Sequence, residues 1–529
     1  MTAPVLRWQA EPRGRRGKSR EVETALARHG LLRRPHALAP GEAAGDNFAP
    51  RLAAALLELG PGFTAFGRFL GSRPDLFDPL SALALLALPD RAAPAPPAVV
   101  SALVAVELGK PPEEAFAQWE AEPRESCLLV QTHGARLAAG EPVLVRFVRP
   151  GALVEVELAV PLLPELGAAF AAAERPDFPL GAAIDDFRAA LAREVDLAAE
   201  ADDLALLGGE VAAGAPLVVP RPHRTLCTTG LLVVDDLGGE PLANNEDTAG
   251  NGDEARRLGL AWLYQALRGS VFPVAPEGSR LLRLPQRRLA FAGGPFARLP
   301  LTTQNNVWRY LLAAADHDPD TAGGYLLREM VRGEGGDEEE LRLRMRQAVP
   351  FRDGAWSAGG NTLAEQLFVD WRFARECGFR PRPALVPFFR GLFAVAAAAR
   401  LLQPERDALR EAVEELRLIA AADRLQNGLQ PDQLVPNLER YAALMLQLPQ
   451  KLDDVLTRAA ESGAPQRAVA AAPPRRGPSI ALALLLAAGA VLILAGYPQR
   501  AGDGLAPFLG VVALGSIGLW LATRRAGKG

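Results

Sequence analysis

Hydrophobic residues follow two patterns along this chain, one with helical spacing and one typical of β-strands. The points at which the pattern changes divide the chain into regions. Apolar positions recur at helical spacing in residues 22–88, for example in PRLAAALLELGPGFTAFGRFL. The helical pattern returns at Asn251 and continues almost to residue 460, as in DALREAVEELRLIAAADRL. Between these regions lie the strand-like runs SCLLVQTHGARL and EPVLVRFVRP, which the turn-like AAGE separates. This pattern predicts a β-hairpin, with LLVVDDL as a third strand.

Breaker-rich clusters such as PDRAAPAPPAV and APQRAVAAAPPRRGPS mark boundaries between the regions. The order of elements predicts an α+β chain that is mostly α, with a further small hairpin inside the second helical region, at 281–292. We expect five parts: a helical N-terminal extension (1–95), a small lobe with β-strands (96–240), a mostly helical large lobe (241–460), a Pro/Ala linker (461–479) and a helical hairpin (480–523).

Two uncharged apolar runs near the C-terminus predict a transmembrane helical hairpin. Ile480–Tyr497 and Leu505–Thr523 each approach the ~20 residues that a helix needs to cross a bilayer, and PQRAGDG joins them. Basic residues flank the outer ends, so the positive-inside rule predicts that both termini and the main domain are cytoplasmic. Glycines in the second run favour close packing of the two helices, or of two copies of the chain. The alternative is a pair of buried core helices.

Composition narrows the class of protein. The formal net charge of -4 argues against a nucleic-acid partner. The three cysteines, Cys127, Cys227 and Cys377, form no Cys-x-x-Cys pair, which predicts neither a zinc site nor a disulfide framework and suits a reducing compartment. No apolar stretch follows the basic start of the chain, so no signal peptide is expected.

Several segments, in order, carry a family resemblance. ELGPGFTAFGRFLGSRPDL, VQTHGARLAAGEPVLVRFVRPG, AREVDLAAEADD and PRPHRTLCTTGLLVVDDLGG are similar to segments of the UbiB (AarF-like) family of atypical protein-kinase-like proteins. These segments resemble, respectively, the family's Lys-x-Gly-Gln region, its nucleotide-lobe hairpin, its Glu-x-Asp helix and the strand that enters the interlobe hinge. The resemblance implies a bilobal protein-kinase-like fold with a helical N-terminal extension.

The resemblance also implies a nucleotide cleft at specific residues. Arg146 stands where the family has its phosphate-binding lysine, and Glu194 of the Glu-x-Asp element is its expected partner. Asp196 and Glu200 lie on the same predicted helix, four residues apart and hence on one face. Arginine keeps the charge of lysine but is planar and longer, so it is not a neutral replacement at a phosphate site.

The residues of this chain that align with the family's catalytic and metal-binding positions differ from the family's pattern. GSVFPVAPEGSRLL aligns with the family's catalytic loop, and LAFAGGPFARL aligns with its metal-binding Asp-x-Gly element. RESCLL, in place of the family's alanine-rich loop, brings bulk and negative charge that oppose a triphosphate. The degenerate positions are Pro273 for a His, Ala275 for the catalytic Asp, Arg280 for the metal-binding Asn, Gly293 for the metal-binding Asp, and Ala65 and Arg68 for the Lys and Gln of Lys-x-Gly-Gln.

Two functions remain open from the sequence. The first is a membrane-anchored pseudokinase without catalytic residues or a bound metal, which acts as a lipid- or protein-binding scaffold or regulator. The resemblance links it to ubiquinone biosynthesis, with isoprenoid or quinone lipids or pathway proteins as partners, at a bacterial inner membrane. The alternative is an active kinase or ATPase that uses ATP and Mg²⁺, in which surviving acids such as Glu194, Asp196 and Glu200 hold the metal.

Overall fold

The computed structural model describes residues 12–32, 47–73, 75–173, 175, 178–211, 217–242, 252–333, 335–348 and 362–428. Residues Met1–Arg417 form one compact unit and Leu418–Gly529 a second. The linker at 461–479 and the transmembrane hairpin predicted at 480–523 lie outside the described residues, as does the end of the predicted large lobe.

An antiparallel sheet forms the small lobe, and the predicted hairpin is its centre. The two strands of this hairpin pair without a break from Val130 opposite Val148 to Arg136 opposite Pro142. The predicted third strand pairs with the second strand of the hairpin, and the strand order is β1-β3-β4-β6 with β2 beside β3. The elements of this lobe are α5 (Pro97–Leu108), α6 (Pro112–Ala115), β1 (Gln118–Trp119), β2 (Glu125–Ser126), β3 (Val130–Arg136), β4 (Pro142–Val148), α10 (Leu197–Glu210), η3 (Arg224–Leu226) and β6 (Leu231–Asp235).

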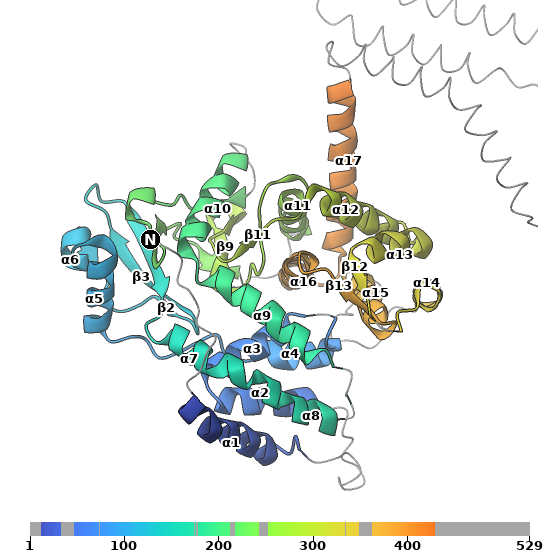
Figure 1. The fold of residues 1–529 in the computed structure, drawn as a ribbon. Coiled ribbons are helices and arrows are strands. Elements are labelled where there is room, and N and C mark those ends of the chain that lie inside the picture. The colour runs from blue at the N-terminus through green and yellow to red at the C-terminus, as the bar shows by residue number, and fades with distance from the viewer. Residues whose placement is uncertain are drawn as a thin grey trace, which may run out of the picture. The chain divides into compact units, whose positions relative to one another are not determined.

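The two faces of the sheet are covered by different helices. Figure 1 shows α5 and α6 beside β3 on one side of this lobe and α10 on the other. Val143, Val145 and Phe147 of β4 are fully buried in a core shared with α5. Because successive side chains of a strand point to opposite faces, Leu144 and Arg146 face α10 instead. The period-two pattern of β4 therefore places a charged side chain on the α10 face.

A helical layer precedes and follows the hairpin in the sequence. Helices of the N-terminal extension share one core with helices from residues 152–194, so the expected boundary at 95/96 does not separate two cores. Phe66 and Phe187, from the two groups, meet edge to face with ring centroids 5.2 Å apart. The elements of this layer are α1 (Pro12–Arg28), α2 (Phe48–Glu58), α3 (Pro61–Gly71), α4 (Pro79–Leu86), α7 (Ala152–Ala159), η2 (Val160–Leu166), α8 (Gly167–Ala172) and α9 (Leu180–Glu194).

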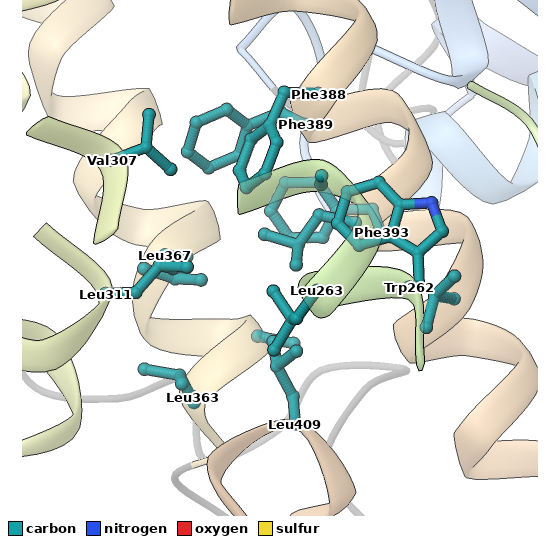
Figure 2. Packing of buried hydrophobic residues seen from close by; sticks show 14 of the residues in the cluster. Trp262, Leu263, Val307, Leu311, Leu363, Leu367, Phe388, Phe389, Phe393 and Leu409 are labelled. Atoms are coloured by element: carbon teal, nitrogen blue, oxygen red, sulfur yellow. The ribbon is translucent and has the colours of Figure 1, made fainter. Parts of the chain in front are cut away.

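The large lobe is mostly helical, as predicted, around an aromatic core. Trp262, Phe388 and Phe389 are almost completely buried there, and Figure 2 shows them packed among leucines of the same core. The indole N–H of Trp262 donates to the carbonyl of Pro273 at 2.8 Å, which ties the core to the loop that enters the cleft. The helices and strands of this lobe are α11 (Gly252–Arg268), α12 (Leu301–Ala315), α13 (Pro319–Arg328), β12 (Met330–Arg332), α14 (Glu338–Gln347), α15 (Leu363–Glu376), β13 (Phe379–Pro381), α16 (Leu385–Leu402) and α17 (Ala408–Gly428).

Short strands follow the small-lobe sheet in the sequence and lead into the large lobe. The hairpin predicted at 281–292 is present, because β9 and β10 pair antiparallel from Leu281 opposite Phe291. A second pair of strands brackets this hairpin in the sequence and holds its two ends together. The elements are β5 (Leu217–Val218), β7 (Glu240–Pro241), β8 (Phe272–Pro273), η5 (Gly278–Arg280), β9 (Leu281–Leu284), η6 (Pro285–Arg287), β10 (Arg288–Phe291) and β11 (Phe296–Ala297).

Among the described residues, one helix is long and apolar enough to cross a membrane by length and composition. This helix is α16, and 67% of it is buried inside the protein. It packs against α11 and carries Phe388, Phe389 and Leu392 into the large-lobe core. Its burial is that of a core helix.

The pH dependence of stability provides a test of the large-lobe core. Burial raises the pKa of Asp370 to about 7, although the hydroxyl of Tyr310 donates to its Oδ2 at 3.0 Å. The folded protein therefore holds a proton that the unfolded chain releases near pH 4, and stability falls as pH rises toward 7. We expect Asp370→Asn to gain about 2–3 kcal/mol relative to the unsubstituted protein between pH 5 and pH 7 in urea unfolding. Asp185→Asn, at a carboxylate 74% exposed, is the control, and equal pH profiles for both variants would contradict the assignment.

Candidate functional site

Three of the four predicted cleft residues, Arg146, Glu194 and Glu200, line a cleft between the small-lobe sheet, helices α9 and α10, and the loop after β8. Its main cavity has a volume of about 180 Å³. Ligand pockets for nucleotide-sized molecules usually exceed ~300 Å³. The cavity is lined by Arg68, Asp90, Glu125, Cys127, Val130, Thr132, Arg146, Glu194, Glu200, Glu277, Gly278, Ser279, Arg280, Gly294 and Pro295.

Arg146 and Glu200 form a buried ion pair at the back of the cleft. The Arg146 Nη1 lies 2.5 Å from Glu200 Oε1, and the two side chains are 10% and 6% exposed. Glu200 is buried on α10 together with Leu197 and Leu204, three residues before it and four after, so it faces the sheet. The cation that the resemblance assigns to phosphates is therefore already neutralised by a carboxylate.

The chain at Gly293 and Gly294 packs directly onto this pair. Glu200 Oε1 accepts a hydrogen bond from the Gly294 N–H at 2.8 Å. Gly293 has φ of +129°, and a Cβ added there would lie 2.5 Å from Arg146 Nη1 and 2.6 Å from Glu200 Oε1. A side chain at this position would strain the backbone, because L residues rarely adopt this φ, and it would displace the tips of Arg146 and Glu200. The ion pair thus fills the space that the family's metal-binding aspartate would need.

Glu194 has a different partner from the expected one. Its carboxylate pairs with Arg280, which stands in place of the family's metal-binding Asn. Burial alone would raise the pKa of Glu194, but Arg280, with Arg390 and Arg68 nearby, holds it below its usual value. The expected Arg146–Glu194 pair is wrong, because α9 ends at Glu194 and the next helix carries Glu200 toward Arg146.

The other acids near these two are engaged outside the cleft. Asp196 is the N-cap of α10, where its side chain accepts from the Ala199 N–H at 3.0 Å. Asp202 pairs with Arg224 and Asp203 with Arg298. Across the parts of the chain that the structure describes, no three His, Cys, Asp or Glu side chains are grouped as a metal site would require.

Residues of the degenerate Lys-x-Gly-Gln segment reach the mouth of the cleft. Arg68 on α3 donates to the carbonyls of Leu86 and Leu88 at 3.1 and 2.6 Å, and its other Nη lies 3.3 Å from Glu277. Ala65 and Ala275 line a neighbouring cavity of about 70 Å³. Ala275, which aligns with the family's catalytic Asp, therefore offers only a methyl group to this cavity. Glu277, the acidic residue of the same loop, is paired with Arg68.

The segment that replaces the alanine-rich loop divides between the cleft and the surface. Glu125 lines the cleft, and its Oε2 accepts from the Ser279 hydroxyl at 2.6 Å. Arg124 instead turns outward, where it pairs with Glu120 and Asp236 at 2.7 and 2.6 Å. Glu125 and Arg280 thus enter the space expected for a nucleotide, whereas Arg124 does not.

Sequence reasoning missed three residues of this region. Asp90 and Cys127 line both cavities, and burial raises the pKa of the Cys127 thiol, which disfavours its thiolate form. Arg390 reaches the smaller cavity from α16. The signal that could have found it is an arginine in the middle of the apolar run LVPFFRGLFAVAAAA.

The buried pair has a stability signature. We expect Arg146→Met to cost about 3–5 kcal/mol, because Glu200 then remains buried without its partner. The double variant Arg146→Met with Glu200→Gln is expected to recover most of that loss in chemical denaturation. Arg224→Met breaks the exposed pair with Asp202, which lies on α10 like Glu200, and should cost less than about 1 kcal/mol. An Arg146→Met protein as stable as this control would refute the pair.

Known proteins that resemble this chain agree on one family for its kinase-like part. Residues 87–322 match the model of the ABC1 atypical kinase-like domain, which leaves the segment at 58–76 outside the match. A probable protein kinase UbiB of Pseudomonas putida (strain W619) is 33% identical over 196 residues, which are 37% of this chain and 36% of that protein. The one from Azotobacter vinelandii is 33% identical over 212 residues, 40% of each chain. The chain thus spans well under half the length of these relatives.

A solved structure, the complex of Rv3197 with erythromycin from Mycobacterium tuberculosis, has a TM-score of 0.36 and 17% identity, and the match covers 57% of this chain and 84% of that one. At this TM-score the likeness does not establish a shared fold. The family model and the relatives agree with the resemblance found in the sequence. The ABC1 atypical kinase-like domain matched at residues 87–322 and the relatives named UbiB support a member of the UbiB/ABC1 family.

Proposed function

We propose that this protein is a membrane-anchored pseudokinase, a kinase-like scaffold or regulator that binds lipids or proteins and transfers no phosphate. The observation that carries the proposal is the Arg146–Glu200 pair, which occupies the space beside Gly293. In the family's pattern, that space belongs to a Mg²⁺ ligand, and the arginine's position belongs to a phosphate-binding cation.

Energetics favour the non-catalytic function. Phosphoryl transfer is accelerated mainly by positioning and by charges that stabilise the transferred group. Here the base position is Ala275 and one metal-ligand position is Arg280, which is itself paired with Glu194. To free Arg146 for a phosphate, the protein would have to break a buried pair, at a cost of about 3–5 kcal/mol. In an active kinase, metal ions held by acidic ligands stabilise the bound phosphates. Without those ligands, little would offset the cost of breaking the pair when a nucleotide binds.

Location completes the proposal. The apolar runs 480–497 and 505–523, with basic residues outside them, support a two-helix anchor that leaves the kinase-like domain in the cytoplasm. The relatives' name, UbiB, and the family resemblance support a context in ubiquinone biosynthesis at a bacterial inner membrane. A membrane tether and a cleft without the family's catalytic acids fit a protein that holds a partner or an isoprenoid lipid at the bilayer face.

Nucleotide binding tests the non-catalytic function. We expect millimolar ATP with Mg²⁺ to leave the melting temperature of the full chain in detergent unchanged relative to Mg²⁺ alone. A functional site with Kd one hundredth of the ligand concentration would instead add about 2.7 kcal/mol of stability. The proposal fails if Mg²⁺-ATP raises the melting temperature and Arg146→Ala abolishes the rise, because Arg146 would then hold phosphate as in an active kinase.

Membrane fractionation tests the anchor. We expect the full chain to stay in the membrane pellet after an alkaline wash, because two spanning helices are not released by charge disruption. A chain that stops at residue 460 is expected in the soluble fraction. Full-length chain in the soluble fraction would contradict the anchor.

A matched pair of variants at one position of the second apolar run sharpens this test. Val511→Leu keeps the run apolar, so this variant should remain in the pellet like the unsubstituted chain. Val511→Arg places a charge within the run, which is costly inside a bilayer, and should weaken retention. Equal retention of the two variants would show that residues 505–523 do not enter the bilayer.

A further inference from the structure

A third cavity, of about 320 Å³, is larger than the two in the cleft and differs from them in chemistry. It lies between α4, the loop after β8 and α16. Its volume falls within the ~300–1,000 Å³ range of small-molecule sites. Most of its lining is apolar: Gly71, Ser72, Ala82, Leu83, Leu86, Leu242, Pro276, Glu277, Gly278, Leu281, Phe368, Arg390, Phe393, Ala394, Ala397, Ala398 and Leu401.

Two of the lining leucines are exposed to solvent. Leu83 on α4 is 41% exposed and Leu401 on α16 is 52% exposed. Deeper in the same cavity, Leu281 and Phe393 are buried in the large-lobe core. An apolar wall that runs from exposed leucines to the buried core suits a chain-like apolar ligand that enters from solvent.

Among the described residues that line this cavity, Arg390 is the one cation. Its Nε donates to the Ser72 hydroxyl at 2.8 Å, and its guanidinium lies 5.0 Å from the centroid of the Phe69 ring. No carboxylate of the described residues forms an ion pair with it, because Glu194 pairs with Arg280 and Glu277 with Arg68. Burial lowers the pKa of Arg390 to about 10, and these two carboxylates offset that effect only in part. Glu194 and Glu277 act on Arg390 only through space, so the hydrogen-bonding capacity of its guanidinium is available to an external anion.

The geometry points to a binding site for an anionic amphiphile, whose acidic head group pairs with Arg390 and whose apolar chain lies along α4 and α16. This inference rests on the proposed non-catalytic binding function and deepens it by assigning the chemistry of one ligand. The charge of the head group complements Arg390, and the apolar chain complements the leucine and alanine side chains of the wall. A carboxylate and a phosphate monoester share this chemistry.

The loop in the position of the family's catalytic loop connects this site to the cleft. Glu277 and Gly278 line both the apolar cavity and the main cleft cavity. Arg390 likewise lines the apolar cavity and the smaller cleft cavity. A bound amphiphile therefore contacts the loop that aligns with the family's catalytic loop.

Competition binding tests the site. The full chain in nanodiscs is titrated with a fluorescent long-chain fatty acid, which is then displaced by dodecanoate, dodecyl phosphate, dodecanol or acetate. We expect dodecanoate or dodecyl phosphate, or both, to displace it, and the two arms tell a carboxylate from a phosphate head group. Arg390→Gln is expected to weaken the acidic competitors about tenfold or more and to leave dodecanol unchanged.

Two further variants keep the outcome interpretable. Ala397→Leu fills the apolar wall and leaves Arg390 intact, so it should weaken every long-chain competitor. Arg288→Gln removes an exposed arginine on β10, outside the three cavities, and should change nothing. The site is refuted if Arg390→Gln behaves like Arg288→Gln, or if acetate competes as well as dodecanoate. Because no nucleotide is present, this failure is distinct from a failure of the pseudokinase proposal, which Mg²⁺-ATP binding would cause.

Discussion

The cleft of this protein depends on one interaction, the buried ion pair between Arg146 on β4 and Glu200 on α10. The pair joins the sheet to the helix behind it, and Glu200 also accepts the N–H of Gly294. Glycine suits position 293 because its φ of +129° is rarely adopted by other residues and because it has no side chain to displace the pair. One electrostatic contact thus fixes the sheet, the helix and the segment that bears the family's metal-binding position.

A second ion pair neutralises charged side chains at another side of the cleft. Arg280 and Glu194 neutralise one another where the family has a metal-binding Asn and the partner of its lysine. Charges that could act on a triphosphate are thereby satisfied within the protein, and removal of either partner would leave a costly buried charge. The apolar cavity beyond the loop differs, since the one cation in its described lining, Arg390, donates to the Ser72 hydroxyl and forms no ion pair with a described carboxylate. We therefore expect the domain to bind its ligand in the apolar cavity and not in the cleft.

The sequence predicted the small-lobe hairpin because the period of two in β3 and β4 is strong. Arg146 of that hairpin lines the main cavity, and its role toward a nucleotide stays a prediction. The prediction from the sequence failed on the partner of Arg146. Glu194, Asp196 and Glu200 look like one helix, and no Gly or Pro marks the break at which Asp196 caps α10. The shared core of the N-terminal helices with α7–α9 also escaped prediction, because helical periodicity shows that a face is buried but not which distant helices cover it.

The most direct measurement of the central claim is an experimental structure of the full chain determined with Mg²⁺ and a non-hydrolysable ATP analogue. The account predicts that Arg146 contacts Glu200, that Arg280 contacts Glu194, and that no nucleotide density lies between them. It is contradicted if the analogue occupies the cleft with its phosphates on Arg146 and Glu200 turned toward a metal ion.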